Sequence, residues 1–212
     1  MTIALFSDSQ SLRECVDAVS QAGPVVALHA GAHPLAGLLR ASLADPDRLI
    51  AADVRRGELS RVNFDAVAAV ILDLTAEELL SSAGRRLVDV LGRLAQEELV
   101  LALVGDPVSL TGALLIDGVT AGLNLIPRTV VLVDVAGVHN LHDALAAVRD
   151  AGLRILACDG SVGVVYTHGQ DAVRVHGRGT VLLGALRAGQ SSAQPTMRLQ
   201  VLTAGMTSGW PA

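Results

Sequence analysis

The segment Leu99-Val100-Leu101-Ala102-Leu103-Val104-Gly105-Asp106-Pro107-Val108-Ser109 decides the fold of this chain. Its first six residues are apolar without interruption, which is typical of a strand covered on both faces by other layers. Such strands belong mostly to parallel sheets, whose strands are connected by helices. The Gly-Asp-Pro that follows is ordinary turn chemistry and marks the end of the strand. The segment therefore predicts a central strand of an α/β sheet.

Strand and helix patterns alternate on both sides of this segment. Apolar runs predict strands at residues 3–6, 25–29, 49–54, 66–72 and 129–135, and helices are predicted at 11–21, 34–43, 82–97, 109–116 and 141–151. The portion from about 153 to 205 differs, because short β runs parted by glycine-rich turns replace the alternation. We predict one domain over residues 1–212. Its fold is a three-layer α/β sandwich with a largely parallel, doubly wound sheet and antiparallel β additions in the C-terminal third.

Composition excludes several classes of protein. All 16 basic residues are arginine, the net charge is −5, and no basic stripe appears, which argues against nucleic acid as a partner. No apolar run approaches the roughly 20 residues of a membrane span, and the first residues have no signal-peptide pattern. Two cysteines are too few for a disulfide framework. We expect a cytoplasmic protein with no membrane partner, and the absence of a glycine-rich phosphate loop predicts no cofactor.

The turn after residues 99–104 is the most informative place for chemistry. In open α/β sheets, ligands bind beyond the carboxyl ends of the strands. Here a buried strand leads through Gly105-Asp106-Pro107 into the small residues Thr111-Gly112-Ala113. A sharp turn from strand to helix is the setting of a nucleophile elbow, which exposes one reactive side chain at its apex.

From this turn onward the chain resembles the cyanophycinase and peptidase E family of serine peptidases, which has a class I glutamine amidotransferase-like fold. The matching stretches occur in family order. They are 105–113 for the elbow G-T-S-A-G-A, 116–127 for the stretch ending G-L-G-L-L-P, 130–134 for the strand carrying D-Q-H-F, 152–161 for G-L-G-I-D-E, and 199–205 for V-H-V-L-x-x-G. The resemblance covers most of the chain and is faint before residue 66. It implies the same sheet, and dimerisation through the scaffold.

The reactive residues of that family do not carry over. The nucleophile falls on Leu110 or Pro107, depending on the alignment, and the D-Q-H-F histidine falls on Ala136. The glycines of the family T-G-G-D motif fall on residues 74–77, which contain none. Only the acid remains, as Asp159, and an acid without a base or nucleophile does not catalyse acyl transfer. The resemblance therefore predicts a pseudoenzyme with no catalytic residues.

An alternative keeps the chemistry with a displaced nucleophile. Ser109 would attack, His139 or His142 would act as base, and Asp159 would orient that base in a weak hydrolase of aspartyl peptide bonds. Against this, an elbow presents one side chain, and a shift of one residue turns that side chain away. A serine that caps the following helix explains Ser109 equally well.

Other reactive side chains have structural interpretations. His29 and His33 are four residues apart, and His139 and His142 are three apart, which are spacings that can share a metal in a helix. No third ligand follows in a recognisable pattern, so we predict exposed or capping histidines and no metal. Cys158 has no neighbouring base in the sequence, which predicts a buried, unreactive thiol.

The sequence thus predicts a non-catalytic protein that acts as a binding or partner subunit. By analogy with the family, its partners would be a second copy of itself or an active paralogue, and a small peptide is a possible ligand.

Overall fold

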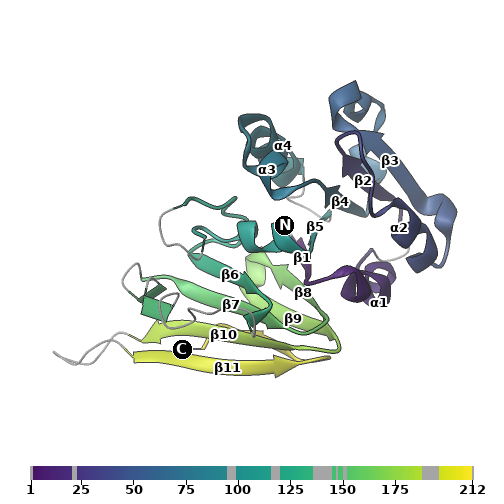
Figure 1. Ribbon diagram of the computed structural model, residues 1–212. Coiled ribbons are helices and arrows are strands. Elements are labelled where there is room, and N and C mark those ends of the chain that lie inside the picture. The colour runs from purple at the N-terminus through teal and green to yellow at the C-terminus, as the bar shows by residue number, and fades with distance from the viewer. Residues whose placement is uncertain are drawn as a thin grey trace.

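The computed structural model describes residues 2–20, 23–94, 99–115, 120–135, 145–146, 148–149, 152–187 and 196–211. The larger of two sheets has eight strands in the order β12-β9-β8-β1-β5-β4-β2-β3 (Figure 1). These are β1 (Thr2–Phe6), β2 (Val25–His29), β3 (Leu49–Asp53), β4 (Ala69–Asp73), β5 (Val100–Val104), β8 (Val162–Thr167), β9 (Ala172–Gly177) and β12 (Thr207–Gly209). β1 to β5 are mutually parallel. β8, β9 and β12 are each antiparallel to the strands beside them in the sheet. The prediction that β5 is central is confirmed.

The second sheet has four strands in the order β11-β10-β7-β6. They are β6 (Thr129–Val133), β7 (Arg154–Asp159), β10 (Thr180–Arg187) and β11 (Thr196–Thr203). β6 and β7 are parallel, and β10 and β11 are antiparallel to their neighbours. The mixed α/β fold is confirmed, with one addition: the late strands are divided between two sheets.

Layers cover both faces of the larger sheet. α1 (Ser9–Val19) and α2 (Ala36–Ser42) pack on the face that carries Ala4 and Phe6. The opposite face, which carries Ile3 and Leu5, packs against α3 (Ala76–Leu80), α4 (Ser82–Leu94) and the inner face of the second sheet. Figure 1 shows the two helix pairs on opposite sides of the parallel strands. Successive side chains of a strand point to opposite faces of the sheet, so Ala4 and Phe6 lie on one face and Ile3 and Leu5 on the other.

The helices are short. α4 is the longest that the structure describes, with 13 residues, whereas a helix needs about 20 apolar residues to cross a bilayer. Accordingly, none of the helices in the described ranges is long and apolar enough to span a membrane.

The start of α1 differs from the sequence prediction. The helix begins at Ser9, two residues early, because Asp8 is the N-cap and accepts a hydrogen bond from the backbone N–H of Ser11. Ser11 in turn accepts one from the backbone N–H of Asp8. This reciprocal pair is a capping box, and it replaces the box that the sequence places at residues 11–14.

The helix expected over residues 109–116 is not formed. A 3₁₀ helix spans Asp106–Thr111, and the chain is extended after it. The carbonyls of Thr111, Gly112 and Ala113 accept hydrogen bonds from the backbone of residues 122–126. These carbonyls are therefore not available to accept the hydrogen bonds of a continuing helix, and the helix ends. Residues 116–119, and most of the helix expected at 141–151, lie outside the described residues; 145–146 and 148–149 are helical.

Candidate functional site

The carboxyl ends of five parallel strands meet at one edge of the larger sheet. The turns after β1, β5, β4, β2 and β3 begin there, in that spatial order. This is the edge at which open α/β sheets bind ligands. Two features occupy it: the turn after β5, and a group of charged residues beyond β2, β3 and β4.

Gly105 occupies the apex of the turn after β5. It directly follows the strand, and its backbone angles are φ +70° and ψ −142°, a conformation that L side chains rarely adopt. Its N–H donates to the carbonyl of Phe6, and its carbonyl accepts from the N–H of Val108. A nucleophile elbow places its reactive residue on such a strained turn immediately after the strand. Here the residue with that backbone conformation is a glycine.

The positions that the sequence assigned to a nucleophile lie further along the 3₁₀ helix. Leu110 is only 4% exposed and belongs to the main hydrophobic core, and Pro107 is half-buried. Ser109 is half-buried, and its hydroxyl donates a 2.8 Å hydrogen bond to the carbonyl of Asp106. The interpretation of Ser109 as a helix N-cap is wrong, because the cap position of the 3₁₀ helix is Gly105.

The expected acid and bases are only partly within the described residues. Asp159 is exposed at the end of β7, opposite Thr180 on β10. Its neighbouring turn contacts the turn after β1, since Ser7 donates to the carbonyl of Gly160 at 2.8 Å. In the ranges that the structure describes, no hydrogen bond or ion pair joins Asp159 to Ser109. Ala136, His139 and His142 lie outside those ranges.

Beyond β2, β3 and β4, two aspartates and two histidines gather on the face covered by α2. The sheet register places His29 opposite both Asp53 and Asp73. His33, four residues after His29, stacks on it with ring centroids 4.6 Å apart and planes inclined by 4°. Nδ1 of His33 lies 2.5 Å from Oδ2 of Asp73, which also accepts a 3.1 Å bond from the N–H of Leu35. We call these four side chains the Asp-His cluster.

Asp53 fixes the turn after β3. Burial alone would raise its pKa, but hydrogen bonds from the backbone of Arg55 and Gly31, and electrostatic interactions with His29 and Arg56, hold the pKa below its ordinary value. The N–H of Arg55 donates to Asp53 at 2.9 Å, and the N–H of Asp53 donates to Glu58 at 2.8 Å. The carboxylate therefore ties the turns after β2 and β3 together.

The prediction of exposed or capping histidines is wrong for His29 and His33. Both are half-buried, and Nδ1 of His29 and Nε2 of His33 are buried with no hydrogen-bond partner among the described residues. Within the same part of the chain, no three His, Cys, Asp or Glu side chains converge to hold a metal ion. Cys158 is buried as predicted, and burial raises the pKa of its thiol to about 12.

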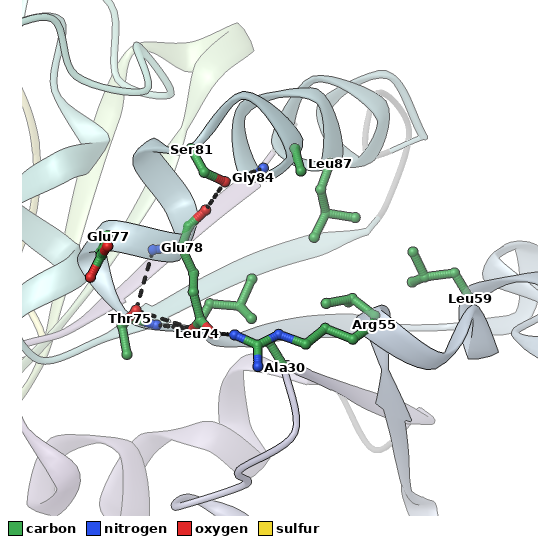
Figure 2. A pocket seen from close by; sticks show the side chains of 12 residues that line it. Ala30, Arg55, Leu59, Leu74, Thr75, Glu77, Glu78, Ser81, Gly84 and Leu87 are labelled. Atoms are coloured by element: carbon green, nitrogen blue, oxygen red, sulfur yellow. Dashed lines mark hydrogen bonds and ion pairs between the residues drawn. The ribbon is translucent and has the colours of Figure 1, made fainter.

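A cavity of about 640 Å³ lies on the opposite face of the same edge. Most of its lining is apolar, and its charged residues come from the turn after β3 and from α3. The lining residues are Ala30, Val54, Arg55, Leu59, Leu74, Thr75, Glu77, Glu78, Ser81, Ala83, Gly84 and Leu87. Figure 2 shows the Arg55 side chain reaching across toward Glu78, with Leu59 and Leu87 on the walls beside it.

An ion pair marks the polar end of this cavity. One guanidinium nitrogen of Arg55 lies 2.7 Å from Oε1 of Glu78, and the two side chains are 66% and 26% exposed. Oε2 of Glu78 accepts from the N–H and the hydroxyl of Thr75 at 2.9 and 3.1 Å, as the capping box of α3 requires. Glu77 and Glu78 lie in the first turn of α3, where negative charge stabilises a helix.

Sequence reasoning missed this cavity because its polar residues have no local signature. Arg55 and Glu78 are 23 positions apart, and only the fold brings them together. The sequence does contain one indication of Arg55, because this residue follows the end of β3 by two positions, and strand ends on this edge bind ligands.

Comparisons with known proteins agree with this fold. No protein-family model and no curated protein matches the chain. Among solved structures, the chain is similar to the crystal structure of a peptidase from an acI-B1 Actinobacterium, with a TM-score of 0.60 and 14% sequence identity. The match covers 99% of this chain and 96% of the other. At this identity, the likeness establishes a peptidase-like α/β fold.

Proposed function

We propose that this protein is a non-catalytic member of a peptidase-fold group, related to cyanophycinase and peptidase E, that acts by binding. The observation that carries the proposal is Gly105 at the apex of the turn after β5, where an elbow would present its nucleophile. The solved peptidase to which the chain is similar supports the comparison with a peptidase turn.

The neighbouring side chains support the same conclusion. The hydroxyl of Ser109 donates to a backbone carbonyl within its own 3₁₀ helix, rather than to a base. Leu110 contributes to the core and so faces away from solvent. An activated serine needs a base within about 3 Å of its oxygen, and Ser109 has none among the described residues.

Binding is the role that the remaining geometry favours. The cavity beside Arg55 and Glu78 has the volume and mixed lining of ordinary small-molecule sites, which range over about 300–1,000 Å³. It lies on the ligand-binding edge. β2, which leads to the lining residue Ala30, is two strands away from β5, which leads to Gly105. We therefore assign binding to this cavity and no covalent step to the turn after β5.

The test of lost catalysis uses a fluorophosphonate serine probe. The wild-type chain and Ser109→Ala are each incubated with the probe, and their intact masses are measured. We expect no adduct on either chain. A stoichiometric adduct on the wild-type chain that disappears in Ser109→Ala would overturn the proposal and favour the displaced-serine hydrolase, with aspartyl peptides as the next substrates to assay.

A partner role is tested separately. Sedimentation of the purified chain gives its oligomeric state, and co-purification with a paralogue that retains G-T-S-A-G-A tests the heteromer. A stable complex with such a paralogue would make this chain a subunit of an active peptidase. A strictly monomeric chain that does not co-purify leaves ligand binding as its role.

A further inference from the structure

We propose that the cavity beside Arg55 and Glu78 binds a free α-amino acid with an apolar side chain, as its zwitterion. This inference rests on the proposed binding function and names the ligand class of that same site. It follows from the charges at one end of the cavity, the apolar surface at the other, and the turns that hold Arg55 in place.

The ion pair has capacity left on both partners. Arg55 uses one of its five N–H donors on Oε1 of Glu78, and the structure shows no other partner for its guanidinium among the described residues. Oε1 of Glu78 accepts only that bond, whereas Oε2 is committed to Thr75. A ligand carboxylate can therefore bind Arg55, and a ligand ammonium can bind Oε1, without breaking the pair.

The placement of the charges favours a zwitterion over a simple ion. The charged lining is Arg55, Glu77 and Glu78, so a bare carboxylate would meet two negative charges. A bare amine would meet the guanidinium, which lies 2.7 Å from the carboxylate that the amine must reach. A ligand that carries both charged groups on one carbon atom places each beside its opposite.

The other end of the cavity is suited to an aliphatic or aromatic side chain. Leu59, Leu74 and Leu87 come from three separate parts of the chain and line the same space. Figure 2 shows Leu59 and Leu87 on facing walls above the Arg55 side chain. Burial of a ligand side chain against them contributes roughly 25 cal/mol for each Å² of apolar surface removed from water.

Arg55 is held in position by the turns beneath it. Its backbone N–H is bound by Asp53, and a guanidinium nitrogen lies 3.7 Å from the point where a Cβ on Gly31 would stand. Gly31 has φ +81°, and its backbone also binds Asp53. The backbone at Arg55 is thus fixed, and the ion pair with Glu78 orients its guanidinium, which lowers the entropy lost when a carboxylate binds.

The experiment is isothermal titration calorimetry of the full chain with four probes. They are leucine, N-acetylleucine, which is only an anion, leucinamide, which is only a cation, and leucyl-leucine, whose charges are far apart. We expect leucine to bind at least about tenfold more tightly than each of the other three. Equal binding of any of the three, or no binding of leucine, would overturn the inference.

Matched variants locate the site. Arg55→Met removes the cation and keeps the length of the side chain, and we expect it to weaken leucine binding by about tenfold or more. Arg61→Met is the control, because Arg61 is a nearby exposed arginine that does not line the cavity. Glu78→Gln keeps a helix-capping side chain and should also weaken leucine binding. An equal loss in Arg61→Met would contradict the assignment.

The fluorophosphonate experiment distinguishes a wrong ligand class from a wrong assignment of the non-catalytic role. If leucine fails to bind and no adduct forms, the ligand class is wrong and the non-catalytic role stands. If an adduct forms on Ser109, the non-catalytic role fails whatever leucine does.

Discussion

His33 forms a short bond to Asp73, from which it is separated by 40 positions: Nδ1 of the imidazole lies 2.5 Å from Oδ2 of the carboxylate. The side chains are 14% and 5% exposed, so this pair is largely withdrawn from water. The same oxygen accepts the N–H of Leu35 at the start of α2. Asp73 thereby fastens the turn after β2 to the end of β4, and it orders the edge at which the cavity lies.

Removal of this carboxylate should destabilise the chain. Asp73→Ala leaves the N–H of Leu35 and the ring of His33 without their acceptor, and buried donors that lose a partner cost about 1–3 kcal/mol each. We expect the free energy of unfolding, measured by urea denaturation, to fall by that order. Asp65→Ala is the control, because Asp65 is exposed on the surface. Equal losses in the two variants would show that the bond does not contribute.

Gly84 allows α4 to pack closely against α3. A Cβ on Gly84 would lie 2.0 Å from the carbonyl oxygen of Glu78 and 2.7 Å from that of Leu79, and both are backbone atoms that cannot move alone. Gly84→Ala should therefore lower the free energy of unfolding by roughly 1–3 kcal/mol. Because the displaced helix lines the cavity, leucine binding should weaken as well.

The matched control for this substitution is Gly37→Ala in α2. A Cβ at that position would meet nothing within 4 Å, and alanine is the better helix former by about 1 kcal/mol. We expect this variant to be as stable as the wild type or more so. A stable Gly84→Ala would mean that α3 and α4 separate without cost.

Alkaline pH should destabilise the protein through two buried groups. Burial raises the pKa of the Cys158 thiol from 9.0 to about 12. Burial, followed by a hydrogen bond to Asp171, raises the pKa of Tyr166 from 10.0 to about 12. Both groups ionise in the unfolded chain before they ionise in the folded one, so their contribution is complete below pH 9 and is lost as the pH rises toward 12.

Cys158→Ala tests this linkage. The slope of unfolding free energy against pH, measured in urea between pH 8 and about 11, should become less steep by up to about 1.4 kcal/mol per pH unit. The loss of packing shifts the whole curve and leaves the slope as the diagnostic quantity. An unchanged slope would show that folding does not raise the pKa of the thiol, and rapid alkylation by iodoacetamide at neutral pH would show that the thiol is not buried.

The sequence predicts the strands well because each is a local pattern. The apolar run at 25–29 matches β2 residue for residue. The same reasoning could not divide the strands between two sheets. β6 and the centre of β7 are apolar like β5, and apolarity does not say which layer covers a strand.

The site was less accessible to sequence reasoning than the fold. Asp73 and His33 were each visible at a strand end, but their bond spans 40 positions and depends on the β2–β4 register. The resemblance to a peptidase elbow directed attention to Pro107 and Leu110. The positive φ of Gly105, which defines the apex, is a backbone property that tertiary hydrogen bonds to Phe6 and Val108 fix.

Acid should release the C-terminal segment through Asp171. Burial opposes ionisation of this carboxyl, but hydrogen bonds from Arg154, Tyr166 and Trp210 hold its pKa below the ordinary value of 3.8. These hydrogen bonds are 2.6 Å long to Arg154, 2.9 Å to the Tyr166 hydroxyl and 3.1 Å to the indole nitrogen of Trp210. A lowered pKa stabilises the fold above pH 3.8, and that contribution is lost as the pH falls through the folded value.

Trp210 reports this loss because it is the single tryptophan of the chain, and its ring lies under the Arg154 guanidinium at 4.3 Å. In the wild type, its fluorescence should shift to the red below pH 3.8 as the indole loses its acceptor. Asp171→Asn keeps a residue that tolerates the left-handed backbone there, φ +48°, and it should abolish the transition. Asp65→Asn, an exposed carboxyl elsewhere, should retain it. A transition that persists in Asp171→Asn would mean that another carboxyl holds the C-terminal segment in place.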